Sequence, residues 1–147
     1  MKRIFLTFLL LSVTIGYSQK INEKLKNSIE TDTVKELSIE LENLKYSIDD
    51  CFELKEKPYS LFALAIKLEK ENLFNFLIER KANLNKICED KSPLMYATKY
   101  GNIKYVKKLI ENGAEINLKN DEGKTALDYA KKYEQTEIVH YLESIKK

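Results

Sequence analysis

The stretch "KSPLMYATKYGNIKYVKKLIENGAEIN" (residues 91–117) decides the fold, because its skeleton occurs three times along the chain. It returns downstream as "KTALDYAKKYEQTEIVHYLESI" (124–145) and appears upstream as "YSLFALAIKLEKENLFNFLIERKANLN" (59–85). When the three copies are aligned, alanines coincide at spacings of 32 and then 33 residues: Ala65, Ala97 and Ala130. Such a period indicates a repeat architecture, in which each unit buries its apolar side against its neighbours.

Each copy is predicted to form two helices joined by a tight turn. The chain has only two prolines and four glycines, so long stretches are free of helix breakers. Ser92 is placed to cap the first helix, and Pro93 suits its first position because that N–H has no helical partner. Ala97 falls where two helices approach closely, and a larger side chain would push the layers apart. Gly101 and Gly113 follow the two helix ends, where a left-handed residue closes the last turn.

On these residues the sequence resembles the ankyrin-repeat family, and in particular its small exported bacterial members. The matching positions are Ser92-Pro93-Leu94, Ala97, Gly101, Val106, Leu109 and the run from Gly113 to Asn117. The resemblance covers residues 60–147. It implies an all-α solenoid of stacked helix-turn-helix units with short hairpin loops, with about three repeats plus one degenerate N-terminal unit.

The chain also departs from the family pattern. Met95 and Asp128 stand where the family favours histidine, and the unit that begins at Ser60 lacks both usual glycines. Lys81 replaces the second glycine of that unit, and Glu134 replaces the first glycine of the last unit. These turns must either cost more free energy or adopt another geometry.

The pattern divides the chain after residue 18 into four units. They are a degenerate N-terminal unit (19–58), two repeats (59–91 and 92–124) and a C-terminal capping repeat (125–147). Terminal units of a solenoid need a polar outer face, so atypical end repeats are expected. Within the first unit we expect helices at 21–29 and 33–45, followed by a long connection over 46–58.

Residues 1–18 have the pattern of a signal peptide. Lys2 and Arg3 precede an apolar run over 4–15, and Gly16 and Ser18 provide small residues before a cut after Ser18. The run is too short for a membrane-spanning helix, which needs roughly 20 apolar residues. We therefore expect export to the periplasm or the medium, without stable membrane insertion after cleavage. The alternative is an uncleaved N-terminal anchor.

The charge of the expected mature chain argues against nucleic acid as a partner. Removing Lys2 and Arg3 leaves 23 of the 25 basic residues against 23 acidic ones. A strongly basic face is the usual footprint of nucleic-acid binding, and a chain with net charge near zero does not indicate one. We expect a monomer that binds a protein partner.

No pattern of catalytic residues, cofactor binding or metal binding is present in the sequence. His140 is the only histidine, which removes any site that needs two, and it falls at a position expected to be exposed on an outer helix. Phosphate-binding glycine loops and the common hydrolase and zinc motifs are missing. Paired loop acids lack the regular ligand spacing of a calcium loop. The sequence predicts a protein that is not an enzyme and holds no cofactor.

Cys51 and Cys88 are the only two cysteines. They fall in the long connection and in the following hairpin loop, on the same edge of the predicted solenoid. Export would place them in an oxidising compartment, where a bridge persists and would join the degenerate unit to the first good repeat. The alternative is two unpaired thiols, because loop tips need not approach to the distance of about 6 Å between Cα atoms that a disulfide requires.

The family resemblance implies that a partner meets the inner helices and the hairpin tips. The inner positions combine one lysine and one large side chain per repeat, and the last tip carries two acids: Lys67, Leu68, Lys99, Tyr100, Lys132, Tyr133, Asp121 and Glu122. Lysine next to an aromatic ring combines charge pairing with rigid contact area, a composition found at binding hot spots. The alternative is that these are ordinary solvated lysines and turn residues.

Three functional hypotheses follow. The first is an exported ankyrin-repeat module that binds an envelope or secreted protein, as an inhibitor or immunity-type partner. The second is an accessory protein for envelope stress or for stabilising an enzyme. The third is a hydrolase or sugar-binding protein that uses the same scaffold.

Overall fold

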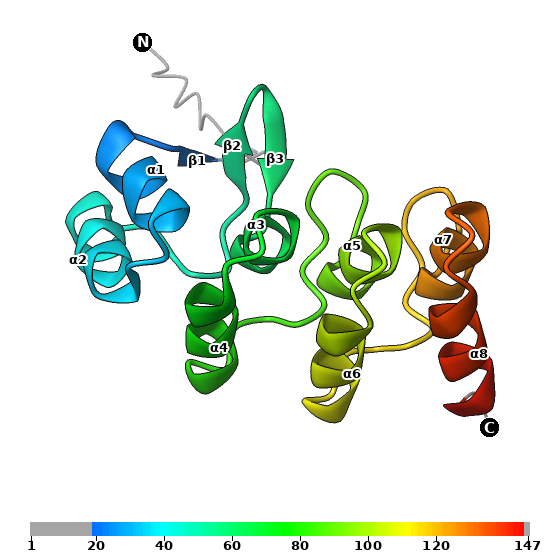
Figure 1. The fold of residues 1–147 in the computed structure, drawn as a ribbon. Coiled ribbons are helices and arrows are strands. Elements are labelled where there is room, and N and C mark those ends of the chain that lie inside the picture. Colours follow the sequence, from blue (N-terminus) through cyan, green and yellow to red (C-terminus); the bar gives the residue numbers. More distant parts are fainter. Residues whose placement is uncertain (1–18, 146–147) are drawn as a thin grey trace, which may run out of the picture.

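The computed structural model describes residues 19–145, and within them the chain forms four stacked helix pairs (Figure 1). The pairs are α1 and α2 (Glu23–Glu30, Val34–Leu44), α3 and α4 (Leu61–Lys67, Glu71–Glu79), α5 and α6 (Pro93–Lys99, Ile103–Glu111), and α7 and α8 (Ala126–Lys132, Thr136–Ile145). The predicted helical repeat solenoid is confirmed. The predicted signal peptide, residues 1–18, lies outside the described residues.

The inner helices α3, α5 and α7 begin in the same way because each has a hydroxyl cap. Ser60 Oγ accepts a hydrogen bond from the amide of Ala63 at 3.1 Å, and Ser92 Oγ accepts one from the amide of Met95 at 3.3 Å. Thr125 caps α7, and the Asp128 carboxylate accepts the Thr125 amide in return at 2.8 Å. Such caps satisfy amides that no helical carbonyl can reach.

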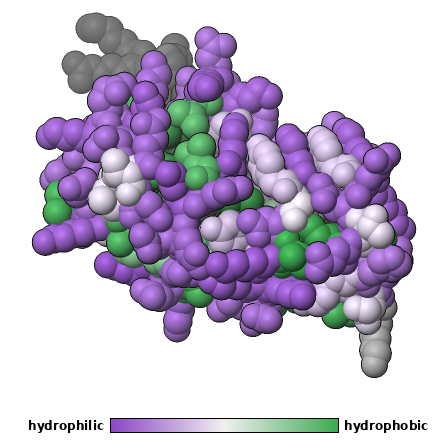
Figure 2. All heavy atoms as spheres, in the orientation of Figure 1, coloured by the Kyte–Doolittle hydropathy of each residue, from purple (hydrophilic) through white to green (hydrophobic). Residues whose placement is uncertain are grey.

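The repeats stack through alanine seams. Ala65, Ala97 and Ala130 are each the fifth residue of their helix, and each is fully buried. The inner helices contact one another in chain order, α3 with α5 and α5 with α7. The face seen in Figure 2 is mostly hydrophilic, with apolar side chains in separate patches, as expected for a solenoid whose core lies between its units.

The turns without glycine keep the left-handed geometry. Glu134 has φ of 55° where Gly101 has 70°, and Lys81 has φ of 54° where Gly113 has 98°. The residues after Gly101 and Glu134 donate in the same way to the carbonyls of the seam alanines Ala97 and Ala130, at 3.0 and 2.9 Å. These turns therefore keep the same geometry at a higher cost in free energy, and do not adopt another geometry.

The long connection contains strands that the sequence analysis did not predict. Phe52–Leu54 (β2) and Lys57–Tyr59 (β3) form an antiparallel hairpin, and Gln19–Lys20 (β1) pairs parallel with β2. Figure 1 shows this hairpin projecting on the same edge as the loops before α5 and α7. The hairpin therefore takes the place of a repeat loop at this point of the solenoid.

Candidate binding groove

Three lysines end the three inner helices. Lys67, Lys99 and Lys132 are the last residues of α3, α5 and α7. The carbonyls at a helix C-terminus carry partial negative charge, which favours a cation at this position. The repeat period thus places one lysine per unit along one edge of the inner face.

Tyrosines pack beside these lysines. The ring of Tyr96 on α5 stacks on the ring of Tyr100, which follows the helix, with centroids 6.3 Å apart. In the next repeat, the ring of Tyr129 stacks in the same way on that of Tyr133, with centroids 6.4 Å apart. Tyr100 and Tyr133 are 43% and 37% exposed. Lys99 Nζ lies 5.6 Å from the ring centre of Tyr100 and 5.8 Å from that of Tyr133. The ammonium of one repeat is therefore held between aromatic rings of two repeats.

A hollow of about 360 Å³ lies where the β2–β3 hairpin faces the ends of α3 and α5. We call it the inner groove and define it by its lining residues: Lys55, Lys57, Tyr59, Lys67, Glu89, Tyr96, Lys99 and Tyr100. It brings together three of the predicted partner-binding residues, Lys67, Lys99 and Tyr100. Its other residues come from the hairpin, the loop before α5 and the buried side of α5.

Glu89 is the one acid of the inner groove, and its charge is already neutralised. Its carboxylate lies 2.7 Å from Lys57 Nζ, accepts a 2.7 Å hydrogen bond from the Tyr96 hydroxyl and lies 3.8 Å from Lys91 Nζ. Burial raises the pKa of Glu89, but the hydrogen bonds from Lys57 and Tyr96 outweigh it, so the pKa lies below its usual value. Burial, followed by the bond to Glu89, raises the pKa of Tyr96 far above its usual range.

The predicted lysines contact tyrosines. Lys67 Nζ donates to the Tyr59 hydroxyl at 2.7 Å and lies 4.3 Å from the centre of the same ring. Lys132 Nζ lies 5.6 Å from the ring centre of Tyr133. Within residues 19–145, no ion pair involves Lys67, Lys99 or Lys132. Their charges are available to a ligand.

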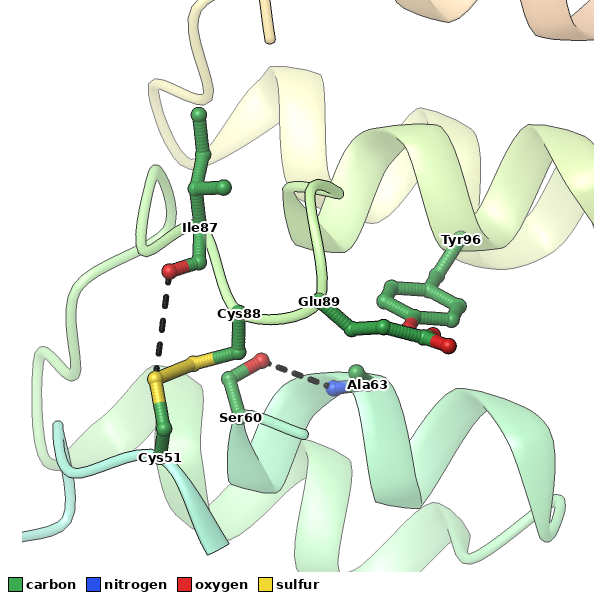
Figure 3. The surroundings of a disulfide bond; sticks show 7 residues. All are labelled: Cys51, Ser60, Ala63, Ile87, Cys88, Glu89 and Tyr96. Carbon is green, nitrogen blue, oxygen red and sulfur yellow. Dashed lines mark hydrogen bonds between the residues drawn. A yellow bond between two sulfur atoms is a disulfide. The ribbon is translucent and has the colours of Figure 1, made fainter. Parts of the chain in front are cut away.

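A disulfide joins the two walls of the inner groove. Cys51 comes directly before β2, and Cys88 comes directly before Glu89. The structure bonds these two cysteines, with their Cα atoms 5.8 Å apart and Cys88 3% exposed. Figure 3 shows the bridge beside Glu89 and Tyr96, with the Cys51 sulfur 3.8 Å from the carbonyl oxygen of Ile87. The bridge fixes the base of the hairpin against the loop that supplies Glu89.

The other predicted residues lie outside the inner groove. Leu68 is half-buried and packs against the core. Tyr133, directly after α7, continues the row of exposed tyrosines, and Asp121 is exposed at a loop tip. Lys132 and Glu122 line a second hollow of about 320 Å³ over α7, together with Lys124, Asp128, Tyr129 and Lys131.

Sequence reasoning missed five of the eight residues that line the inner groove. Tyr96 was detectable, because Tyr96 and Tyr129 precede the exposed tyrosines by four residues and share the repeat spacing. Lys55, Lys57 and Tyr59 were not, because they enter the groove only through a hairpin that lies outside the repeat pattern.

The described part of the chain offers neither a membrane-spanning helix nor a cluster of metal ligands. No helix between residues 19 and 145 is long and apolar enough to cross a membrane. In the same range, no three histidine, cysteine, aspartate or glutamate side chains are grouped so as to hold a metal ion.

Comparison with known proteins gives a consistent result. The family described as "Ankyrin repeats (3 copies)" matches residues 26–120 and again 61–146. The chain is 36% identical over 74 residues to a putative palmitoyltransferase of Danio rerio, covering 49% of this chain and 12% of that protein. It is 27% identical over 126 residues to a putative ankyrin repeat protein of Borreliella burgdorferi, covering 82% and 29% of the two chains. It thus spans less than a third of either relative's length. A putative ankyrin repeat protein of Rickettsia bellii is 29% identical over 136 residues, with 80% of each chain covered.

Proposed function

The chain belongs to the ankyrin-repeat family, whose repeats form protein–protein interaction modules, and we propose that it is exported and binds one envelope or secreted protein through its inner face. The binding surface consists of the inner groove together with Lys132 and Tyr133. The protein acts as a monomer and controls its partner as an inhibitor or immunity-type protein.

The observation that carries this proposal is the row of tyrosines and lysines along the inner helices. Among the described residues, the large apolar or aromatic side chains exposed by more than about a third are Ile39, Tyr100 and Tyr133, and the two tyrosines lie together on the inner face. Exposed tyrosines supply rigid contact area and are enriched at interface hot spots, and the unpaired lysines beside them supply charge.

The rigidity of the inner groove favours binding of one specific partner and not of many weak ones. Its walls are fixed by the disulfide and by the bonds of Glu89 to Lys57 and Tyr96. A surface that is already ordered loses little conformational entropy on binding, and this favours one complementary partner. Surfaces that accept many partners are typically flexible enough to repack.

Export is supported by two independent features. The N-terminal 18 residues have the charge and apolar pattern of a signal peptide. The bridge between Cys51 and Cys88 belongs to the type of structure that persists in oxidising compartments.

Capture of the partner tests the binding function. Tagged residues 19–147 are incubated with envelope and secreted extracts of the source organism, and retained proteins are quantified by mass spectrometry. We expect one protein in a stoichiometric amount, lost in the double variant Tyr100→Ala, Tyr133→Ala. The matched control is Ile39→Ala, which removes an even more exposed apolar side chain from outer helix α2 and should leave capture intact.

Equal capture by the tyrosine double variant and the wild type contradicts the placement of the site. Retention of several proteins in small amounts favours the accessory role instead. Export is tested separately, by expressing the full chain with a C-terminal tag and measuring the mass of the product in each cell fraction. We expect a periplasmic or secreted product that begins at Gln19, and a full-length product in the cytosol contradicts export.

A further inference from the structure

We propose that the segment recognised by the inner face is an extended acidic peptide, whose carboxylates pair with Lys67, Lys99 and Lys132. This inference rests on the proposed function, because it specifies the chemistry of the partner at the same surface. Each of the three repeats would then contribute one lysine–carboxylate pair.

The charge of the inner groove favours an anionic ligand. Its lining includes four lysines and a single acid, and that acid is already bound to Lys57. Lys67 and Lys99 contact tyrosines instead of carboxylates. On the outer helices some lysines are neutralised between repeats, as when Lys104 of α6 pairs with Glu71 of α4. The inner groove therefore carries an excess of positive charge that an anionic ligand can neutralise.

The spacing of the lysines selects the conformation of the peptide. The three lysines occupy the same end of neighbouring helices, which pack at interaxial distances of roughly 8–10 Å. A polyproline II segment has three residues per turn and rises about 3.1 Å per residue, so every third side chain faces the same way at about 9 Å. An acidic residue at every third position of such a segment thus matches the lysine row.

The loop tips favour a peptide over a bulky polyanion. Asp90, Asp121 and Glu122 lie on the loops that border the inner face. A nucleic acid or sulfated glycan that spans the face would bring its own charges close to these carboxylates, which repel it. A slender peptide can follow the helix ends, with its acids on the lysines and its backbone against the tyrosines.

Fluorescence anisotropy with a defined probe tests the proposal. The probe is a labelled peptide of four Glu-Pro-Pro units, and the matched peptides carry Gln-Pro-Pro units or the same residues as one block of glutamates followed by prolines. We expect residues 19–147 to bind the first peptide most tightly, and the affinity to fall as salt rises. The variant with Lys67→Glu, Lys99→Glu and Lys132→Glu should bind at least about tenfold more weakly.

The control variant is Lys107→Glu on the outer helix α6. Like Lys99, Lys107 is a lysine held against an aromatic ring, in this case Tyr141 at 5.4 Å, but it lies on the opposite side of the helix stack. It should leave peptide affinity unchanged. A second triple variant with methionine at the three inner positions removes the charges but keeps the apolar stems, and it should lose binding to a similar degree.

Equal affinity for the Glu-Pro-Pro and Gln-Pro-Pro peptides, or equal affinity of the wild type and the triple glutamate variant, overturns the proposal. Tighter binding to heparin or to a single-stranded oligonucleotide also overturns it, in favour of a polyanion. If no acidic peptide binds but the protein partner is still captured through Tyr100 and Tyr133, only the acidic segment is wrong. If capture itself fails while the peptide binds, the proposed partner fails and the acidic preference stands.

Discussion

The two halves of the solenoid are held together by different means. From α3 to α8 the units stack through buried alanines at equivalent positions, Ala65, Ala97 and Ala130. The N-terminal unit shares the same apolar core through Leu25 and Leu37, and it is linked in addition by a three-stranded sheet, the Cys51–Cys88 bridge and polar bonds between units. A terminal unit with a degenerate sequence thus adds a sheet and a covalent bridge to the apolar packing that all units share.

One of these links is a helix cap supplied across units. The N-cap residue of α4, Lys70, makes no side-chain cap, whereas Asn102 caps α6 within its own unit at 3.1 Å. Asp32, in the turn between α1 and α2, accepts hydrogen bonds from the amides of Asn72 and Leu73 at 2.9 and 2.8 Å. The N-terminal unit therefore completes the first regular repeat.

Removing the disulfide should have the largest effect, and the effect should be local. The bridge closes a loop of 37 residues, for which the chain-entropy relation gives about 4 kcal/mol. We expect the double variant Cys51→Ser, Cys88→Ser to lose protection from hydrogen exchange in α1 and α2, while α5 to α8 remain protected. Mass spectrometry of exchanged peptides, with urea unfolding alongside, measures both. Equal loss of protection in α7 and α8 would show that the two halves are not held separately.

A larger side chain at an alanine seam should act across units. In Ala97→Leu, the added methylenes have no space between α5 and its neighbours, so we expect a loss of about 2–3 kcal/mol. The same exchange experiment should show loss of protection in α3 and α7 as well as in α5. Lys107→Leu is the control, because it adds a leucine at an exposed position of α6. Destabilisation confined to α5 contradicts stacking as the source of stability.

The sequence predicted the stacked half far better than the attached half. Helix pairs, caps and the lysine and tyrosine rows follow a period that can be counted, and so their positions could be derived. The hairpin follows no such rule: its two turn residues, Lys55 and Glu56, have φ of 52° and 63°, where Asn-Gly is the usual signal. Since this hairpin builds one wall of the inner groove, the groove was predicted only in part.

Asp32 allows the cross-unit cap to be tested. Asp32→Ala leaves the amides of Asn72 and Leu73 without their acceptor, and loss of a cap costs about 1–2 kcal/mol. Asp32→Asn retains an acceptor and tolerates the left-handed backbone at this residue, where φ is 58°, so its loss should be smaller. Urea unfolding measures the difference. Equal losses in the two variants would mean that the backbone, and not the cap, sets the cost.

The smallest expected effect is a gain in stability from replacing Glu134, which lies in the left-handed turn between α7 and α8. Glu134 adopts φ of 55° at the position equivalent to Gly101. A left-handed residue with a Cβ costs roughly 1–2 kcal/mol, and part of this is offset because glycine loses more entropy on folding. We expect Glu134→Gly to raise the free energy of unfolding by about 0.5 kcal/mol. The reverse change, Gly101→Ala, should destabilise, because a residue with a Cβ is strained at φ of 70° and the Gln135 side chain, 2.5 Å from the new Cβ, would have to turn away. A loss of stability in Glu134→Gly would indicate that its side chain contributes more at this turn than its backbone geometry costs.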